Sequence, residues 1–168
     1  MSKLQELQQE QVDWVIYNFG DRDAWQPLLG IIEELGELEE ARFMADLDGI
    51  KDAIADTMIY TADLCTAIGL EINNVWKLRR KNIQQHSTMI WAGKLSHSYL
   101  KMAQGIRGSE QEHIDDMFVI LTYIVGILNV QAVLLGTTAE DLAYDTWQNV
   151  KKRDWKKYPE TGLPVEQD

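Results

Sequence analysis

Cysteine is almost absent from this sequence of 168 residues, in which Cys65 is the only one. A single cysteine excludes an internal disulfide framework and agrees with a reducing cytoplasm, where we expect the protein to reside. Cys65 lies within an apolar segment, so we interpret it as a small core residue rather than a nucleophile. Residues 1–14 contain no apolar signal core, and no secretory targeting is predicted from them.

Proline and positive charge are also scarce. The chain has 3 Pro, and its 16 Lys and Arg face 27 Asp and Glu, which gives a net charge of −11. Few prolines and long helical periodicities predict an all-α fold, a bundle of about seven helices in one domain spanning residues 1–168. The acidic excess argues against nonspecific nucleic-acid binding, which needs a basic surface. A polyanionic substrate can still bind where cations and a few local Lys and Arg reverse the field.

Charge is missing altogether from residues 117–136, so a membrane span has to be considered. Polar residues interrupt this stretch, and no Lys or Arg flanks it closely, so no positive-inside signature exists. Ser109 and Glu112 have capping-box spacing and open a helix that runs to about residue 135. We interpret this helix as the apolar centre of the bundle and expect no membrane partner.

Acidic residues are what the chain has in abundance, and they gather on two adjacent predicted helices. The first spans about residues 25–47, and the second follows a turn at Asp48-Gly49, with Asp48 as its N-cap. A connection this short makes the two helices antiparallel neighbours. The first helix carries Glu33, Glu34, Glu37, Glu39 and Glu40, and the second carries Asp52, Asp56 and Asp63.

Four of these acids share helix faces with apolar residues. Glu34 and Glu37 are three residues apart, and Asp52 and Asp56 are four apart. Carboxylates beside a core-facing stripe are costly unless they are neutralised, either by raised pKa values or by a cation. Several oxygen ligands on facing helices suit Mg²⁺, with Mn²⁺ as an alternative.

A solvated acidic face is the competing interpretation. It suits Glu39 and Glu40 well, but it suits Asp56 poorly because Ile54 and Met58 surround that residue at helical spacing. A purely structural acidic bundle would need neither metal nor ligand.

A basic stripe is predicted on a later helix at about residues 89–104. Lys94, His97 and Lys101 fall at i, i+3 and i+7, and Arg107 follows in a loop bracketed by glycines. Such a group can clamp a triphosphate, although a solvated basic edge has the same pattern. An earlier helix at residues 71–85 carries the basic run 77–81, which we interpret as a solvated helix end.

The acidic motifs resemble a known family. EELGE followed by DAIAD is similar to the EExxE and ExxD motifs of the MazG-like all-α nucleoside triphosphate pyrophosphohydrolases. Asp56 matches the closing Asp, but Ala53 stands where the pattern places Glu, and Asp52 is the nearest substitute. The first motif is matched by Glu33, Glu34 and Glu37.

The resemblance implies hydrolysis of a nucleoside triphosphate to the monophosphate and pyrophosphate, with Glu33 or Glu37 taking the proton of the attacking water. Two further stretches support it, because GKLSHSYLKMAQGIRG and the tail WQNVKKRDWKKYPETG are similar to segments of the same family. The Mg²⁺ ligands it implies are Glu34, Glu37, Asp52 and Asp56. The substrate-binding residues it implies are Trp14, Asn18, Trp25, Lys94, His97, Lys101, Arg107, Lys151 and Arg153. Packing of the bundle end is the alternative role for Trp14, Asn18 and Trp25.

A weak internal repeat is visible at residues 25–85 and 89–155. GELEEA recurs as GKLSHS, and IADTMIYTADL recurs as IDDMFVILTYI, although shared helical periodicity produces similar matches. We therefore expect two degenerate helical units. We also expect the protein to form a homo-oligomer, a dimer, and to act on a nucleoside triphosphate. The competing function is a non-catalytic nucleotide- or metal-binding helical module.

Overall fold

The computed structural model describes residues 1–81 and 87–164, and within them the chain forms helices and no strands. The predicted all-α fold of about seven helices is therefore confirmed. The helices are α1 Lys3–Phe19, α2 Trp25–Met44, α3 Leu47–Ala67, α4 Ile72–Leu78, α5 Thr88–Gln104, α6 Glu110–Leu134 and α7 Ala139–Val150.

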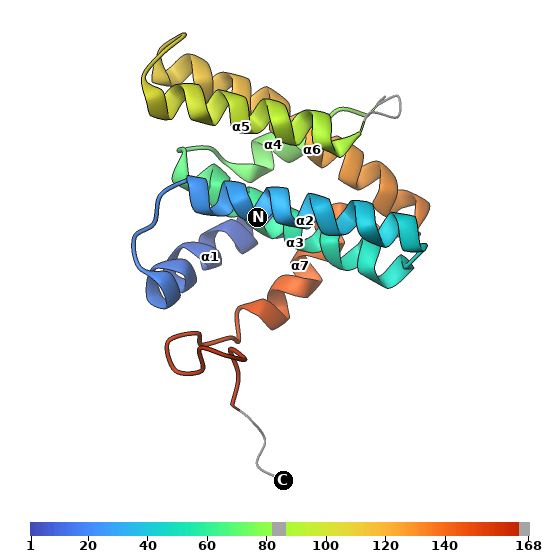
Figure 1. Ribbon diagram of the computed structural model, residues 1–168. Helices are drawn as coiled ribbons and strands as arrows, with labels where there is room; N and C mark the ends of the chain where they lie inside the picture. Colours follow the sequence, from blue (N-terminus) through green and yellow to red (C-terminus); the bar gives the residue numbers. More distant parts are fainter. Residues whose placement is uncertain (82–86, 165–168) are drawn as a thin grey trace.

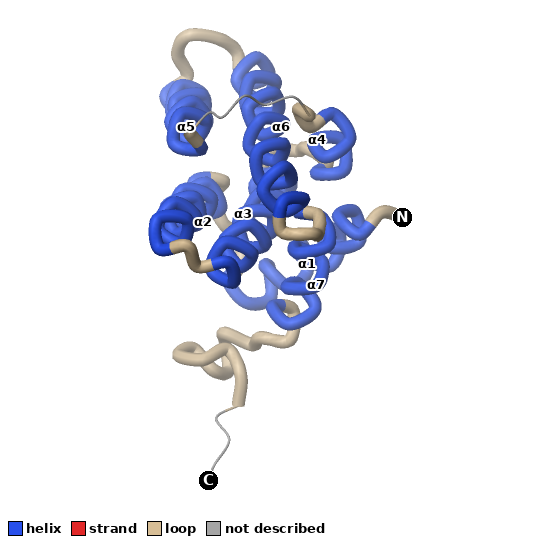
Figure 2. Tube along the Cα trace, turned by 90° about the vertical axis from the view of Figure 1, so that its right-hand side faces the viewer, coloured by secondary structure: helices blue, strands red, loops and turns tan. Residues whose placement is uncertain are grey.

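Helix α3 is the centre of the molecule. It packs against α1, α2, α4, α6 and α7, and half of its side chains are buried. In Figure 1 the α5–α6 pair lies on one side of the α2–α3 pair, and α1 and α7 lie on the other side. Figure 2 shows the same order from the side, with the C-terminal tail beyond α7. The acidic helices therefore lie between two other layers of helices, which explains why some of their carboxylates are buried.

The turn between α2 and α3 differs from the predicted one by two residues. Asp46, not Asp48, is the N-cap, and its carboxylate accepts hydrogen bonds from the backbone N–H groups of Asp48 and Gly49 at 3.2 and 3.0 Å. Ala45 closes α2 in the left-handed conformation at φ 55°. The prediction of Asp48 as N-cap was wrong because Asp46 is the residue that precedes the first turn, and an Asp at either place satisfies the capping pattern.

Close packing of α2 on α3 depends on Gly30. A Cβ atom at this position would lie 2.5 Å from the ring of Tyr60, so only glycine allows the ring to lie against the α2 backbone. Tyr60 is thereby held next to Glu33 and Glu34, one helical turn along α2.

Helix α4 is shorter than predicted. It ends at Leu78, and the backbone N–H of Arg80 bonds to the carbonyl of Thr122 on α6. The basic run is therefore largely beyond the helix, with Arg79 stacked 3.7 Å from the Trp76 ring. Residues 82–85, the end of the predicted helix, lie outside the described residues.

Helix α6 has the predicted bounds and the predicted capping box of Ser109 and Glu112. It is long and apolar enough to cross a membrane, and α3 with α4 would also pass that test if counted as one bent span. More than half of the apolar window of α6 is buried, and α6 packs against α3, α4, α5 and α7, as a core helix does. Thr138 caps α7 by accepting a hydrogen bond from the backbone N–H of Asp141 at 3.1 Å.

Candidate functional site

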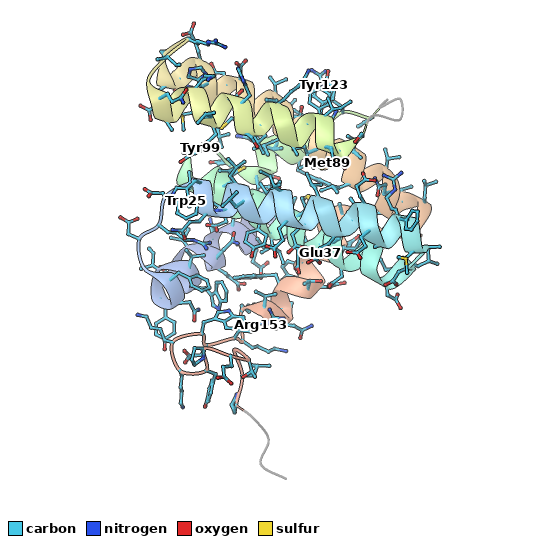
Figure 3. The ribbon with its side chains drawn as sticks, in the orientation of Figure 1. Trp25, Glu37, Met89, Tyr99, Tyr123 and Arg153 are labelled. Carbon is cyan, nitrogen blue, oxygen red and sulfur yellow. The ribbon has the colours of Figure 1, made fainter. Side chains whose placement is uncertain are left out.

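A cavity of about 460 Å³, here called the acidic cavity, opens where α1, α2 and α3 meet the tail after α7. It combines acidic, basic, amide and aromatic side chains from parts of the chain far apart in sequence. Figure 3 shows Glu37 and Arg153 on the same side of the α2–α3 pair, toward α7. The lining residues are Gln11, Trp14, Phe19, Arg22, Glu33, Glu34, Asp56, Ile59, Tyr60, Asp63, Val150, Arg153 and Trp155.

Glu34 and Asp56 bring the two predicted acidic faces together in this cavity. Burial raises the pKa of Glu34 to about 8, and the nearby charges of Asp56, Glu37, Glu33 and Asp52 add to the shift. Burial and then the charge of Asp52 raise the pKa of Asp56 to about 6, while the guanidinium of Arg153 acts in the opposite direction. The wall of the cavity therefore carries mutually repelling carboxylates that a cation would stabilise in their charged forms.

The other three predicted acids surround this pair from the solvent side. Glu33 lines the cavity and is exposed, whereas Glu37 and Asp52 are exposed just outside the lining. Among residues 1–81 and 87–164, no three His, Cys, Asp or Glu side chains stand close enough together to hold a metal ion as placed. The acids are thus grouped electrostatically without forming a closed coordination shell.

One acid was misinterpreted from its position. Glu39 was expected on a solvated face together with Glu40, but it is half-buried and accepts a 2.7 Å hydrogen bond from the Thr88 hydroxyl. It therefore ties α2 to the start of α5, and only Glu40 keeps the solvated role.

The tail reaches the cavity because α1 holds it there. Trp14 Nε1 donates to the backbone carbonyl of Arg153 at 3.0 Å, and the backbone N–H of Trp155 donates to Asn18 Oδ1 at 2.7 Å. Gly162, at φ 71°, lies against the Arg153 side-chain stem, where a Cβ would come within 2.9 Å of it. Of the predicted α1 residues, Trp14 lines the cavity, while Asn18 positions the tail from behind the lining.

Two other predicted substrate contacts lie elsewhere. Trp25 is 45% exposed and its Nε1 bonds to Asp23, outside the cavity lining. Lys151 is paired with Glu10 at 2.9 Å, and the same carboxylate accepts from Trp147 Nε1 at 2.7 Å. Lys151 therefore fastens α7 to α1.

The basic stripe of α5 does not join the acidic cavity. Lys94 and His97 line a second cavity of about 420 Å³ between α5 and α6, together with the stacked rings of Trp91 and Tyr123. The two cavities share no lining residue, and Figure 3 shows Tyr123 on the far side of α5 from Glu37. Lys101 bonds to Gln104 at 3.1 Å, and Arg107 is exposed at φ 64°, so neither reaches the acidic cavity.

Several lining residues were not predicted, although the pattern held a signal for them. Tyr60 and Asp63 follow the predicted Asp56 by four and seven residues on α3, which places all three on one helical stripe. Asp63 is buried and forms an ion pair with Arg22 from the α1–α2 loop.

Comparison of the chain with protein-family models, with curated proteins and with solved structures finds no match.

Proposed function

We propose that this protein hydrolyses a nucleoside triphosphate between its α- and β-phosphates, as a metal-dependent MazG-like pyrophosphohydrolase. The observation that carries the proposal is one cavity lined jointly by carboxylates of two adjacent helices, by two arginines and by four aromatic side chains. Carboxylates and a cation suit the phosphate end of a nucleotide in the presence of a metal, and aromatic rings suit its base. The volume of about 460 Å³ is within the range of small-molecule sites.

The acids fit a magnesium ion by their chemistry. Glu34 and Asp56 provide hard oxygen donors whose pKa values are raised by burial and by neighbouring acids, and a divalent cation would relieve both effects. Glu37 and Asp52 flank them and would complete the ligand set, in which Mg²⁺ also retains water. When bound, the metal would neutralise phosphate charge and lower the pKa of a bound water.

The remaining steps belong to side chains of the chain itself. Glu33 lines the cavity and is exposed, so it is placed to accept the proton of the attacking water, with Glu37 as the alternative. Arg153 supplies the positive charge that the outgoing pyrophosphate requires, a role expected first for the α5 stripe. The rings of Trp14, Phe19 and Trp155 form the apolar part of the wall and limit the access of water to the base.

The test is release of pyrophosphate from a panel of ribo- and deoxyribonucleoside triphosphates, with Mg²⁺ and with a chelator. We expect metal-dependent formation of pyrophosphate and the monophosphate from at least one of them. Release of inorganic phosphate alone, or no metal-dependent product from any nucleotide, would contradict the proposal.

A non-catalytic nucleotide- or metal-binding module is the second candidate. One observation favours its nucleotide-binding form, that no three His, Cys, Asp or Glu side chains in the described residues stand close enough to hold a catalytic ion. In that case nucleotide raises the melting temperature of the protein without product formation.

A further inference from the structure

Helix α1 carries an amide where its core stripe calls for an apolar residue. Its buried face consists of Leu4, Leu7, Gln11, Val15 and Asn18. Gln11 is 3% exposed, and a buried amide is costly unless its polar atoms are hydrogen-bonded. Asn18 uses both ends of its amide, donating to the carbonyl of Trp14 and accepting from the tail. Gln11 uses only one of them.

The orientation of the Gln11 amide follows from its one partner. Nε2 donates to the backbone carbonyl of Ile59 at 3.0 Å. A carbonyl oxygen only accepts, so the nitrogen has to face Ile59, and Oε1 has to point away from it. Oε1 is buried and has no hydrogen-bond partner among the residues that the structure describes. The side chain lines the acidic cavity, which leaves a fixed, unused acceptor in its wall.

Arg22 offers an unused hydrogen-bond donor in the same cavity, which complements the unused acceptor of Gln11. Its Nη2 is engaged by Asp63, and its Nε is buried without a partner in the described part of the chain. Arg22 also lines the cavity and lies over the Phe19 ring, with its guanidinium carbon 5.1 Å from the ring centre. Burial lowers the pKa of Arg22, which reflects the cost of holding this cation in the wall.

We propose that Gln11 is a specificity-determining residue that reads the hydrogen-bonding edge of the nucleobase, with Arg22 Nε reading an adjacent acceptor. The inference rests on the proposed function, in which the acidic end of the same cavity takes the phosphates. A nucleobase presents an N–H donor beside an acceptor on its pairing edge, which matches one unused acceptor and one unused donor. Its ring would lie among Trp14, Phe19 and Trp155, which line the same cavity.

A structural role for Gln11 would account for its bond to Ile59 but not for Oε1. An apolar residue of the same shape would avoid leaving an acceptor buried and unpaired. Gln8 provides the contrast, because it lies one turn earlier on α1 and uses its amide fully. Its Nε2 donates to the Leu70 carbonyl at 2.9 Å, and its Oε1 accepts from the Ile72 N–H at 3.0 Å.

The test compares Gln11→Met with Gln8→Met by titration calorimetry. The probes are the non-hydrolysable α,β-imido analogues of dATP, dCTP, dGTP and dUTP, each beside a counterpart in which every N–H of the pairing edge is replaced by N-methyl, so that exocyclic amino groups are dimethylated. We expect Gln11→Met to weaken binding of the preferred nucleotide about tenfold, the value of one buried hydrogen bond. It should leave the methylated counterpart, which has no N–H to lose, within about twofold. Gln8→Met should leave both affinities within the same margin.

Equal weakening of both nucleotides by Gln11→Met would show a structural role and overturn the inference. So would unchanged binding of the preferred nucleotide, or a wild-type protein that does not distinguish the methylated counterparts. Pyrophosphate release is measured in parallel to separate this inference from the proposed function. Turnover with base selectivity unchanged in Gln11→Met contradicts the inference alone, whereas base-dependent binding without any turnover by the wild type contradicts the proposed function alone.

Discussion

Trp14 Nε1 donates a hydrogen bond to the backbone carbonyl of Arg153 at 3.0 Å, which joins the first helix to the segment after the last one. Both side chains line the acidic cavity, so this bond holds the tail against the cavity. The C-terminal tail is therefore part of the candidate site and not an appendage to it.

Trp14→Phe should loosen Arg153 while it keeps most of the aromatic packing on Trp147. We expect KM for the triphosphate to rise several-fold and stability to fall by about 1 kcal/mol, the value of one hydrogen bond. Steady-state kinetics and chemical denaturation measure the two effects. Trp25→Phe is the matched control, since the Trp25 Nε1 bonds only to the exposed Asp23. An equal rise of KM in both variants would contradict the role of the tail.

Stability without metal should decrease as the pH rises from about 4.5 to about 8. The pKa of Glu34 is raised to about 8 by burial and by Asp56, Glu37, Glu33 and Asp52, so the folded state holds a proton there that the unfolded state has lost. Its contribution is fully present below the unfolded pKa and is lost as the pH passes the folded one; the raised pKa of Asp56, about 6, acts in the same direction. The change is on the order of a few kcal/mol.

Denaturant midpoints at pH 5, 6, 7 and 8 in a chelator measure this effect. Glu34→Gln should flatten the pH dependence, whereas Glu40→Gln, on the solvated face of the same helix, should preserve it. If Glu34→Gln shows the same decrease of stability with pH as the wild type, the raised pKa of Glu34 is not the cause of that decrease.

Gly30 and Gly36 on α2 form a second matched pair. A Cβ at Gly30 would meet the Tyr60 ring at 2.5 Å, whereas a Cβ at Gly36 meets nothing within 4 Å. Gly30→Ala should therefore destabilise the fold by about 1–3 kcal/mol through overpacking. Gly36→Ala should stabilise it by roughly 0.5–1 kcal/mol through helix propensity. Melting temperatures that move in the same direction for both variants would contradict the packing of α2 on α3.

The sequence was sufficient for the helices and for the pairing of the two acidic faces, because both depend on local periodicity and a short connection. It was also sufficient for the capping box of Ser109 and Glu112. The N-cap was predicted two residues too late because Asp46 and Asp48 both satisfy the same capping rule.

The rest of the site depends on which helices become neighbours, and helical phase does not contain that information. Lys94 and His97 share a face of α5 as predicted, but that face borders α6 and not the acidic helices. Gln11 and Asp63 could have been found as polar residues within buried stripes, since such residues need partners. The approach of Arg153 to α1 depends on contacts more than 130 residues apart in the chain, and no local pattern predicts it.

Asp52→Asn tests the ligand that takes the place of the missing Glu at position 53. Asp52 is exposed and raises the pKa of both Glu34 and Asp56, so its charge reaches the proposed metal position. We expect weaker Mg²⁺ activation with stability changed by less than about 1 kcal/mol. Unchanged Mg²⁺ dependence would restrict Asp52 to a helix N-terminal charge, and titration of activity with Mg²⁺ measures the difference.

We propose that the cavity between α2, α3 and the tail is where pyrophosphate is released from a nucleoside triphosphate, and Asp56→Asn tests this proposal most directly. The variant removes one carboxylate charge at the cavity wall and preserves its shape. We predict that its Mg²⁺-dependent pyrophosphate release falls at least about a hundredfold below wild type, since positioned charge at an active site contributes that much. Its circular dichroism should stay helical, and Glu40→Gln should keep wild-type turnover. Wild-type turnover in a folded Asp56→Asn protein would contradict the assignment of this cavity as the active site.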